Sequence, residues 1–410
     1  MEKKEYRQLL SQRQYIRLLL ADTINRFGDS IDVIAYSWIM YEITGSASLM
    51  ALVVGLNFVP TVFLTPFAGA FVDRISTKRV MALADLLRFV FVVAIVTLYS
   101  TGLLSPALIV VFTLATSTVE AFRLPAGGAI LPQLLEKEYY TLGKAANYSV
   151  SRISGLVGYM LAGGVIALIG AVGALWIDAA TFLISSAIIW SIRYQENLQG
   201  AKTVKGVIQD FAEGFRFIRA SRTIQTVSLI GLLINFGIMP LTVFQTPYVS
   251  DYLKMGPETL SYIKILTSVG MITGSALLPK LGKIKTPVIA VAAGVIMGAA
   301  LIEMSIAQSL STSVLKMGIL TLSMLSIGFG GGLLNVVIGS SVMKAVPKEM
   351  MGRISGFLTA MMQASMPIAS FICSALAVYF HIPHILVFFG SLTLICSLAL
   401  YFKKKLDALS

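Results

Sequence analysis

Apolar segments long enough to cross a membrane recur along almost the whole of this 410-residue chain. A helix needs roughly 20 residues to cross the hydrocarbon core of a bilayer. Because backbone groups in lipid must bond within their own segment, the predicted fold class is an all-α polytopic membrane protein. We expect twelve transmembrane helices, at about 16–41, 48–72, 80–100, 106–131, 149–169, 174–192, 223–247, 258–279, 286–307, 313–343, 353–380 and 383–402.

The composition excludes most alternatives to a membrane protein. Hydrophobic residues make up 56% of the chain and charged residues 13%, against roughly 25% charged residues in a typical soluble domain. A soluble enzyme, a disordered scaffold and a fibrous protein are therefore poor interpretations. The sequence also lacks a nucleophile–base pattern and metal-ligand spacing, so we expect no enzyme activity, no cofactor and no metal.

The basic residues predict an orientation. The net charge is +12, and most lysines and arginines fall in turns that share one side of the membrane with both termini. By the positive-inside rule that side is the cytoplasm, which predicts a multi-pass protein of a bacterial plasma membrane. Each basic cluster is a short turn beside a membrane, which argues against nucleic-acid binding. The expected partners are the bilayer, protons and a small-molecule or lipid-like substrate, with the protein a monomer.

The span count divides the chain into two halves. We predict an N-terminal six-helix bundle over 1–192, a cytoplasmic linker with a short interfacial helix over 193–222, and a C-terminal six-helix bundle over 223–410. Two matched six-helix halves are typical of transporters built from parallel repeats.

Ionisable residues within the predicted spans concentrate in the first half. Each costs several kcal/mol in hydrocarbon unless it is paired or hydrated. The four in span 1 fall on one helical face, and two in span 4 reach a similar depth. We therefore expect a proton-coupling and charge network in this half, with Asp29 the leading proton carrier, Glu120 the second, and Arg26 and Arg123 holding them. The members are Asp22, Arg26, Asp29, Asp32, Glu120 and Arg123.

A plainer interpretation of these charges stays open. Asp85–Arg88 and Glu120–Arg123 are spaced i, i+3 on their helices, so each pair can simply neutralise itself. Asp29 can also be a buried structural acid that is hydrogen-bonded to a neighbouring helix, and this interpretation is stronger for Asp178 in span 6.

The turn between spans 2 and 3 contains Gly69, Asp73, Arg74, Lys78 and Arg79. It resembles the signature of the major facilitator superfamily, with Ser76 in place of the usual second glycine.

Two further stretches extend the resemblance over the chain. Span 4, from Val119 through Arg123 to Gly127, is similar to the family's buried-arginine motif, with Ala126 at its usual glutamine. Span 5 resembles the antiporter motif, with Tyr159 in place of its proline. Other stretches resemble the twelve-helix exporters of macrolides and of enterobactin, and the related lysophospholipid transporters. They are Phe27–Ser30, Asp85–Arg88, Ile177–Ala179 and Pro347–Arg353.

The resemblance implies a mechanism, namely two bundles rocking about a central cavity. Asp73 would hold the cytoplasmic gate closed by meeting the start of span 11 near Gly352. Helices 1, 4, 7 and 10 would line the cavity. The residues that we expect to contact substrate there are Asn235, Phe236, Met239, Gln245, Met324 and Asn335, although such residues are also ordinary filling of a span.

The predicted function is a proton-coupled secondary transporter that exports a lipophilic or amphipathic small molecule. The first alternative is a lysophospholipid transporter or flippase on the same scaffold. The second is a non-transporting receptor, which we expect to carry a sizeable cytoplasmic output segment. Only Lys403 to Ser410 follow the last predicted span.

Overall fold

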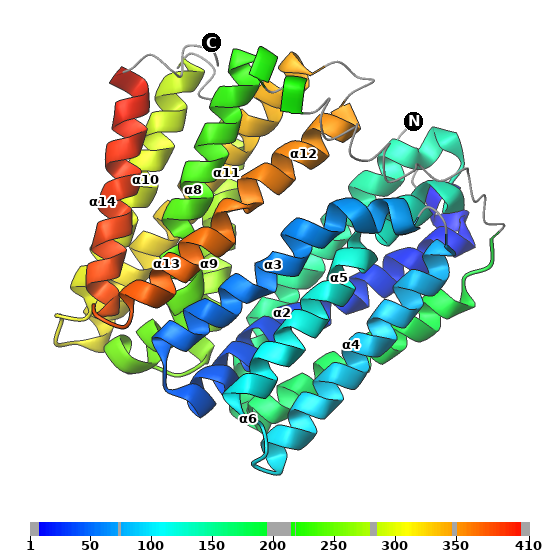
Figure 1. The fold of residues 1–410 in the computed structure, drawn as a ribbon, viewed down its shortest axis with the longest axis horizontal. Helices are drawn as coiled ribbons and strands as arrows, with labels where there is room; N and C mark the ends of the chain where they lie inside the picture. Colours follow the sequence, from blue (N-terminus) through cyan, green and yellow to red (C-terminus); the bar gives the residue numbers. More distant parts are fainter. Residues whose placement is uncertain are drawn as a thin grey trace. The chain divides into compact units, whose positions relative to one another are not determined.

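The computed structural model describes residues 8–72, 75–194, 215–217, 219–278, 285–346 and 351–402. Over these residues the chain is helical and contains no β-strand (Figure 1). This confirms the all-α fold class, in which each spanning segment satisfies its own backbone hydrogen bonds in lipid. The residues group into two compact units. Unit 1 comprises Met1–Thr44 and Leu56–Val207, and unit 2 comprises Gly45–Gly55 and Ile208–Ser410.

The described residues of unit 1 include five long helices and a short 3₁₀ turn. Hydroxyl side chains begin two of them: Ser76 Oγ accepts from the backbone N–H of Arg79, and Ser105 Oγ accepts from that of Leu108. Such caps satisfy amides that have no partner within the helix. The elements are α2 (Arg13–Thr44), α3 (Ala47–Val72, which begins in unit 2), α4 (Thr77–Ser100), α5 (Pro106–Leu134), η1 (Lys137–Tyr139) and α6 (Tyr140–Ser191).

The 52-residue α6 is a helical hairpin with α2 beside both of its arms. At 1.5 Å per residue a straight helix of this length would span roughly 80 Å, far more than the roughly 30 Å of a hydrocarbon core. Gly170 interrupts it with a φ of 74°, inside the turn that the sequence predicts between spans 5 and 6. Ser154 of the first arm donates to Thr23 O (2.7 Å), and Thr181 of the second arm packs on Gly28.

Unit 2 contains the remaining helices. They are α8 (Arg222–Pro247), a π-helical turn η2 (Tyr248–Leu253), α9 (Glu258–Leu277), α10 (Thr286–Ala307), α11 (Ser313–Ala345), α12 (Met351–Gln363), α13 (Ser365–Leu376) and α14 (Ile382–Phe402). Helix α9 packs on α11, α10 packs on α11 and α14, and α8 packs on α13 and α14. The predicted eleventh span is thus divided between α12 and α13.

The interface of α9 with α11 is made by glycines spaced four residues apart on both helices. A Cβ at Gly270 or Gly274 would strike the backbone of α11, and one at Gly328 or Gly332 would strike the backbone of α9. Small residues at this spacing let two membrane helices approach until their backbones touch. This interface of unit 2 is therefore held by close backbone contact rather than by charge, and hydrogen bonds cross it, among them one between Tyr262 and Thr321 (2.8 Å) and one from Ser275 to the backbone oxygen of Gly332 (3.2 Å).

Ten of the described helices are long and apolar enough to cross a membrane, and one of these is the hairpin α6, counted as a single helix. Charged residues on α2 keep it outside this set, although its 32 residues are long enough to span. With α2 and both arms of α6 counted, the described helices match the twelve predicted spans, but the count itself stays a prediction. The predicted linker over 193–222 and its interfacial helix lie largely outside the described residues.

Candidate functional site

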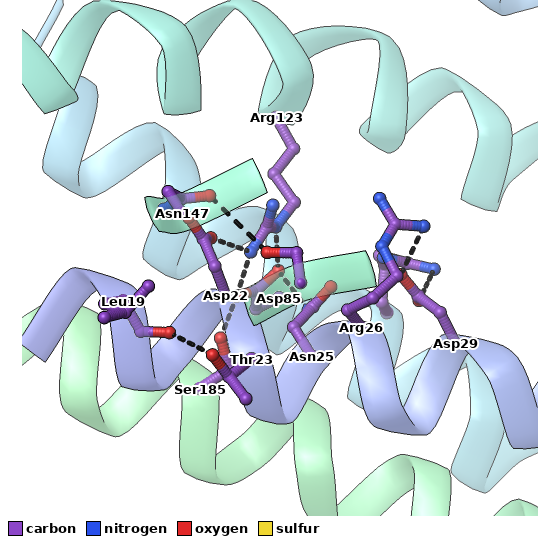
Figure 2. Close-up of polar contacts among 12 residues, drawn as sticks. Leu19, Asp22, Thr23, Asn25, Arg26, Asp29, Asp85, Arg123, Asn147 and Ser185 are labelled. Carbon is purple, nitrogen blue, oxygen red and sulfur yellow. Dashed lines mark hydrogen bonds and ion pairs between the residues drawn. The ribbon is translucent and has the colours of Figure 1, made fainter. Parts of the chain in front are cut away.

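A network of charged side chains lies inside unit 1, where α2, α4, α5 and α6 meet (Figure 2). Asp85 of α4 is at its centre, with none of its surface exposed. Its carboxylate accepts hydrogen bonds from Arg123 Nε of α5 (2.5 Å), Asn25 Nδ2 of α2 (3.2 Å) and Ser185 Oγ of α6 (2.7 Å). One buried acid therefore joins four helices, and its charge is balanced by a guanidinium and two dipoles.

Arg123 connects this acid to a second one. Its Nη2 lies 3.3 Å from Asp85 Oδ2 and 3.4 Å from Asp22 Oδ1, and Asn147 of α6 donates to the other oxygen of Asp22 (3.0 Å). Figure 2 shows the Arg123 side chain reaching into the group formed by Asp22, Asp85 and Asn147. The side chain of Arg123 is 12% exposed and that of Asp22 is 19% exposed, so bulk water screens these contacts only weakly.

A second ion pair lies further along α2. Arg88 of α4 donates from Nη2 to Asp29 Oδ1 (2.8 Å), and Arg26 Nη1 lies 3.7 Å from the other oxygen of Asp29. The guanidinium of Arg88 also stacks on Phe182 of α6, 4.1 Å from the ring centroid. Asp29 is thus held mainly by Arg88, because the side chain of Arg26 is 53% exposed and its longer contact is more strongly solvated.

Three further carboxyl groups of this region make no ion pair with any residue that the structure describes. Asp32 and Glu120 are half-buried, and Arg88 is near enough to both for a coulombic interaction. Asp178 of α6 is fully buried, and neither of its carboxyl oxygens has a hydrogen-bond partner. The region therefore contains more carboxyl groups than the guanidinium groups can neutralise.

The structure places Asp22 beside Arg123 and Asp85, and it pairs Asp29 with Arg88 and Arg26. It also corrects two of the partners expected from the sequence. The prediction that Arg123 holds Glu120 is wrong, because Arg123 is bonded to Asp85 and Asp22. The expectation that Asp85 and Arg88 neutralise each other is also wrong, since each pairs with a residue of another helix. Residues spaced i, i+3 lie near each other on the surface of one helix. The Arg and Asp side chains are also long enough to reach a charged residue on a helix packed beside them, and they can pair with that residue instead.

Asp85, Arg88 and Asn147 take part in these contacts but are absent from the network predicted from the sequence. A signal for the first two was present: span 3 carries an acid and an arginine that lie as deep in their helix as the charges of span 1 lie in theirs. Asn147 had no such signal, because it lies before the predicted start of span 5.

The predicted gate residues are only partly described. Gly69 lies near the end of α3, whereas Asp73 and Arg74 fall outside the described residues. Lys78 Nζ donates to the backbone oxygen of Ile192 (2.7 Å), and the backbone N–H of Arg79 is bonded in the cap of α4. The gate assignment therefore stays a prediction.

The residues that we expect to contact substrate lie on α8 and α11. Met239 and Met324 have no exposed surface, and Asn235 Nδ2 donates to the backbone oxygen of Met362 (3.0 Å). Phe236 stacks on a phenylalanine of α14 with centroids 5.3 Å apart. Gln245 is half-buried and Asn335 is exposed. In unit 2 itself, the two methionines are thus core residues, and Asn335 is the member most open to a ligand.

Comparison with known proteins shows the family. The model of the Major Facilitator Superfamily matches residues 18–371, which is most of the chain. The chain belongs to this superfamily. Its members are transporters rather than enzymes, which confirms the sequence-based exclusion of an enzyme.

Two relatives named as efflux proteins resemble the chain over most of their length. The multidrug efflux pump Tap of Mycobacterium tuberculosis is 24% identical over 364 residues, which cover 86% of this chain and 84% of that protein. The macrolide efflux protein A of Streptococcus pyogenes is 26% identical over 364 residues, with 87% of each chain covered.

Solved structures share the fold at low sequence identity. The nucleoside transporter NupG superposes with a TM-score of 0.72 at 13% identity, covering 94% of this chain and 98% of that one. A bacterial homologue of the iron transporter ferroportin superposes with a TM-score of 0.72 at 16% identity, covering 97% of this chain and 99% of that one. These likenesses show that the chain adopts the same fold as these two solved structures.

Proposed function

We propose that this chain is a proton-coupled exporter of lipophilic or amphipathic small molecules that works by alternating access. In the proposed orientation, both termini lie in the cytoplasm of a bacterial cell and export runs outward across the plasma membrane.

The imbalance of charge in unit 1 is the observation that carries proton coupling. Among the described residues of this cluster, three guanidinium groups (Arg26, Arg88 and Arg123) face six carboxyl groups. The acids are Asp22, Asp29, Asp32, Asp85, Glu120 and Asp178. In surroundings of low dielectric constant an excess of like charge is costly, and carboxyl groups relieve it by binding protons. A cluster of this composition is suited to taking up and releasing protons while it stays folded.

Asp29 is the member best placed to exchange a proton. Its side chain is 16% exposed, and its two oxygens contact two different arginines. Asp85 is completely buried and fully bonded, so we assign it to holding the helices together. A proton that binds Asp29 weakens its contact with Arg88, and this change of partner can shift the balance between two conformations.

The substrate class rests on the relatives. Proteins named for the efflux of macrolides and of several drugs match the chain over more than four fifths of its length. The methionines and aromatic residues of α8 and α11 fit this class, because such side chains pack against varied apolar shapes.

The test is transport in proteoliposomes with an imposed pH gradient, using a radiolabelled macrolide and a lipophilic cationic dye as probes. We expect the gradient to drive transport of at least one probe by wild-type protein, and Asp29→Asn to fold but lose this transport by at least tenfold. Asp251→Asn is the matched control, because Asp251 is an exposed acid of η2, outside the network. Unchanged transport by Asp29→Asn would remove Asp29 from the mechanism.

A lysophospholipid transporter is distinguished in the same vesicles. A fluorescent lysophospholipid that moves between leaflets without a pH gradient, while neither drug probe moves, would replace the exporter proposal. Binding of a probe without any flux would favour the receptor.

A further inference from the structure

Asp178 is a buried acid to which the proposed mechanism gives no role. It lies on the second arm of α6 with no exposed surface, and neither carboxyl oxygen has a partner. Thr181 lies beside it, but its hydroxyl donates to the backbone oxygen of Asp178 (2.7 Å). On the facing helix α2, a Cβ added to Gly28 would lie 2.6 Å from Asp178 Oδ1. The carboxyl group is therefore packed tightly with no donor.

A buried donor without an acceptor lies in the same region. Arg88 Nε has no hydrogen-bond partner, although Nη2 of the same guanidinium is bonded to Asp29. That guanidinium stacks on Phe182, which lies one helical turn after Asp178 on the same face of α6. One arginine therefore lies between a carboxylate that it binds and a second carboxyl group within its electrostatic reach.

The charges that surround Asp178 decide its protonation. Asp29 and Asp32 of α2 and Arg88 of α4 are close enough to Asp178 to act on it electrostatically. While Arg88 is bonded to Asp29, an ionised Asp178 would be a buried charge near two other acids without a hydrogen-bond donor, which is strongly unfavourable. A neutral, protonated Asp178 fits the arrangement seen here.

We propose that Asp178 is a second proton-binding residue, and that Asp29 and Asp178 share one proton and one arginine. In the state described, Arg88 binds the Asp29 carboxylate and Asp178 is the neutral acid. In the alternate state, the O–H bond of Asp178 breaks and its proton forms a new O–H bond on Asp29, directly or through water. Arg88 then binds the Asp178 carboxylate. The total charge is unchanged, and no outside reactant is needed.

The two acids differ in their exposure, and this difference gives them different roles. Asp29 is 16% exposed at its side chain and can exchange its proton with water, whereas the enclosed Asp178 exchanges through a neighbouring acid, and Asp29 is the acid that Arg88 binds. This role for Asp178 rests on the proposed proton coupling, because the shared proton matters for transport only if transport is coupled to protons.

Infrared spectroscopy of purified protein tests the sharing without a substrate. The side-chain carboxyl carbon of aspartate is labelled with ¹³C, so that the carbonyl band of protonated aspartates separates from that of glutamates and lipid esters. The band is measured at neutral pH in proteoliposomes for wild type, Asp178→Asn, Asp29→Asn and the double variant, with Asp251→Asn as control.

If Asp29 and Asp178 share one proton, the effect of Asp178→Asn on the band depends on whether Asp29 is present. Asp178→Asn should remove the intensity of one protonated carboxyl group from wild type and none from Asp29→Asn, because in the latter Arg88 already binds an ionised Asp178. Equal loss in both backgrounds would show a permanently neutral structural acid. Loss in neither would show that Asp178 is ionised from the start. Either result overturns the proposal.

A second variant keeps the test valid if Asp29→Asn does not fold. Arg88→Gln removes the shared cation, so both acids should be neutral and the band should gain the intensity of one carboxyl group over wild type. No gain would overturn the sharing. These readings do not depend on transport. Loss of proton-driven transport in Asp29→Asn with equal band loss in both backgrounds would therefore reject the sharing and leave the exporter proposal standing.

Discussion

Replacing Asp85 by Asn tests whether the network holds unit 1 together. The change keeps the shape of the side chain but removes the charge that accepts from Arg123 at 2.5 Å and 3.3 Å. Arg123 is then left with Asp22, at 3.4 Å. Breaking a buried pair from one side costs about 3–5 kcal/mol, whereas single polar contacts between membrane helices average about 0.6 kcal/mol. Because Asp22 retains part of the pairing, we expect a loss near the lower end, about 3 kcal/mol.

The double variant supplies the decisive comparison. With Arg123→Gln added, no stranded guanidinium remains, and Asp22 keeps its hydrogen bond from Asn147. We therefore expect Asp85→Asn/Arg123→Gln to lose less stability than the single variants Asp85→Asn and Arg123→Gln lose together, with a coupling energy of about 2 kcal/mol. Ser185→Ala, which removes one neutral donor from the same carboxylate, should cost only about 1 kcal/mol.

The assay is reversible unfolding by sodium dodecyl sulfate in mixed micelles, followed by tryptophan fluorescence. All three tryptophans, Trp38, Trp176 and Trp190, belong to unit 1, so the signal reports the unit that carries the network. If the two single losses simply add in the double variant, Asp85 and Arg123 are not coupled, and the network does not stabilise the unit in the way argued.

Two further substitutions test the packing of each unit. Gly158→Val should lower the unfolding free energy of unit 1 by at least about 2 kcal/mol, because even a Cβ there would lie 2.7 Å from the backbone oxygen of Phe27. Gly164→Ala, whose Cβ meets nothing within 4 Å, should change stability little, and equal losses in the two would refute this contact. Tyr248→Phe should cost about 1 kcal/mol in thermal unfolding monitored by a thiol-reactive dye on the buried Cys373 of unit 2, because the Tyr248 hydroxyl donates to a buried backbone oxygen of α10. An unchanged midpoint would show that this bond is dispensable.

Span positions could be predicted from the sequence because they depend on local composition. The turn at Gly170 was visible as a short stretch between two apolar runs, and the structure shows it as a backbone break with positive φ. The close contact of α9 with α11 was not anticipated, although Gly270 and Gly274 face Gly328 and Gly332. A row of glycines in the sequence shows which face of a helix can approach another helix closely, but it does not identify that other helix.

The charge network shows the same limit. The polar face of span 1 could be predicted, since the positions of Asp22 and Asp29 follow from helix geometry alone. The partners could not, because a choice between Arg88 and Arg26 for Asp29 depends on how α4 packs beside α2. Pairs within one helix were the nearest candidates along the sequence. The folded arrangement keeps Arg26 with Asp29 at 3.7 Å, but it replaces the pairs Asp85–Arg88 and Glu120–Arg123 with pairs between helices.

A shared arginine explains how a membrane protein can use buried acids without a large energetic cost. An uncompensated charge in hydrocarbon costs several kcal/mol, and moving a two-state equilibrium from 1:99 to 99:1 takes about 5.5 kcal/mol. A conformational change that stranded Arg88 would therefore be as costly as the whole switch. If Arg88 exchanges Asp29 for Asp178 as the proton moves the other way, both states are neutral at this site. Small differences in the access of water to Asp29 can then decide which of the two states is more populated. The α9–α11 interface of unit 2 carries no ion pair among its described residues, so the proposed switch places no charge there.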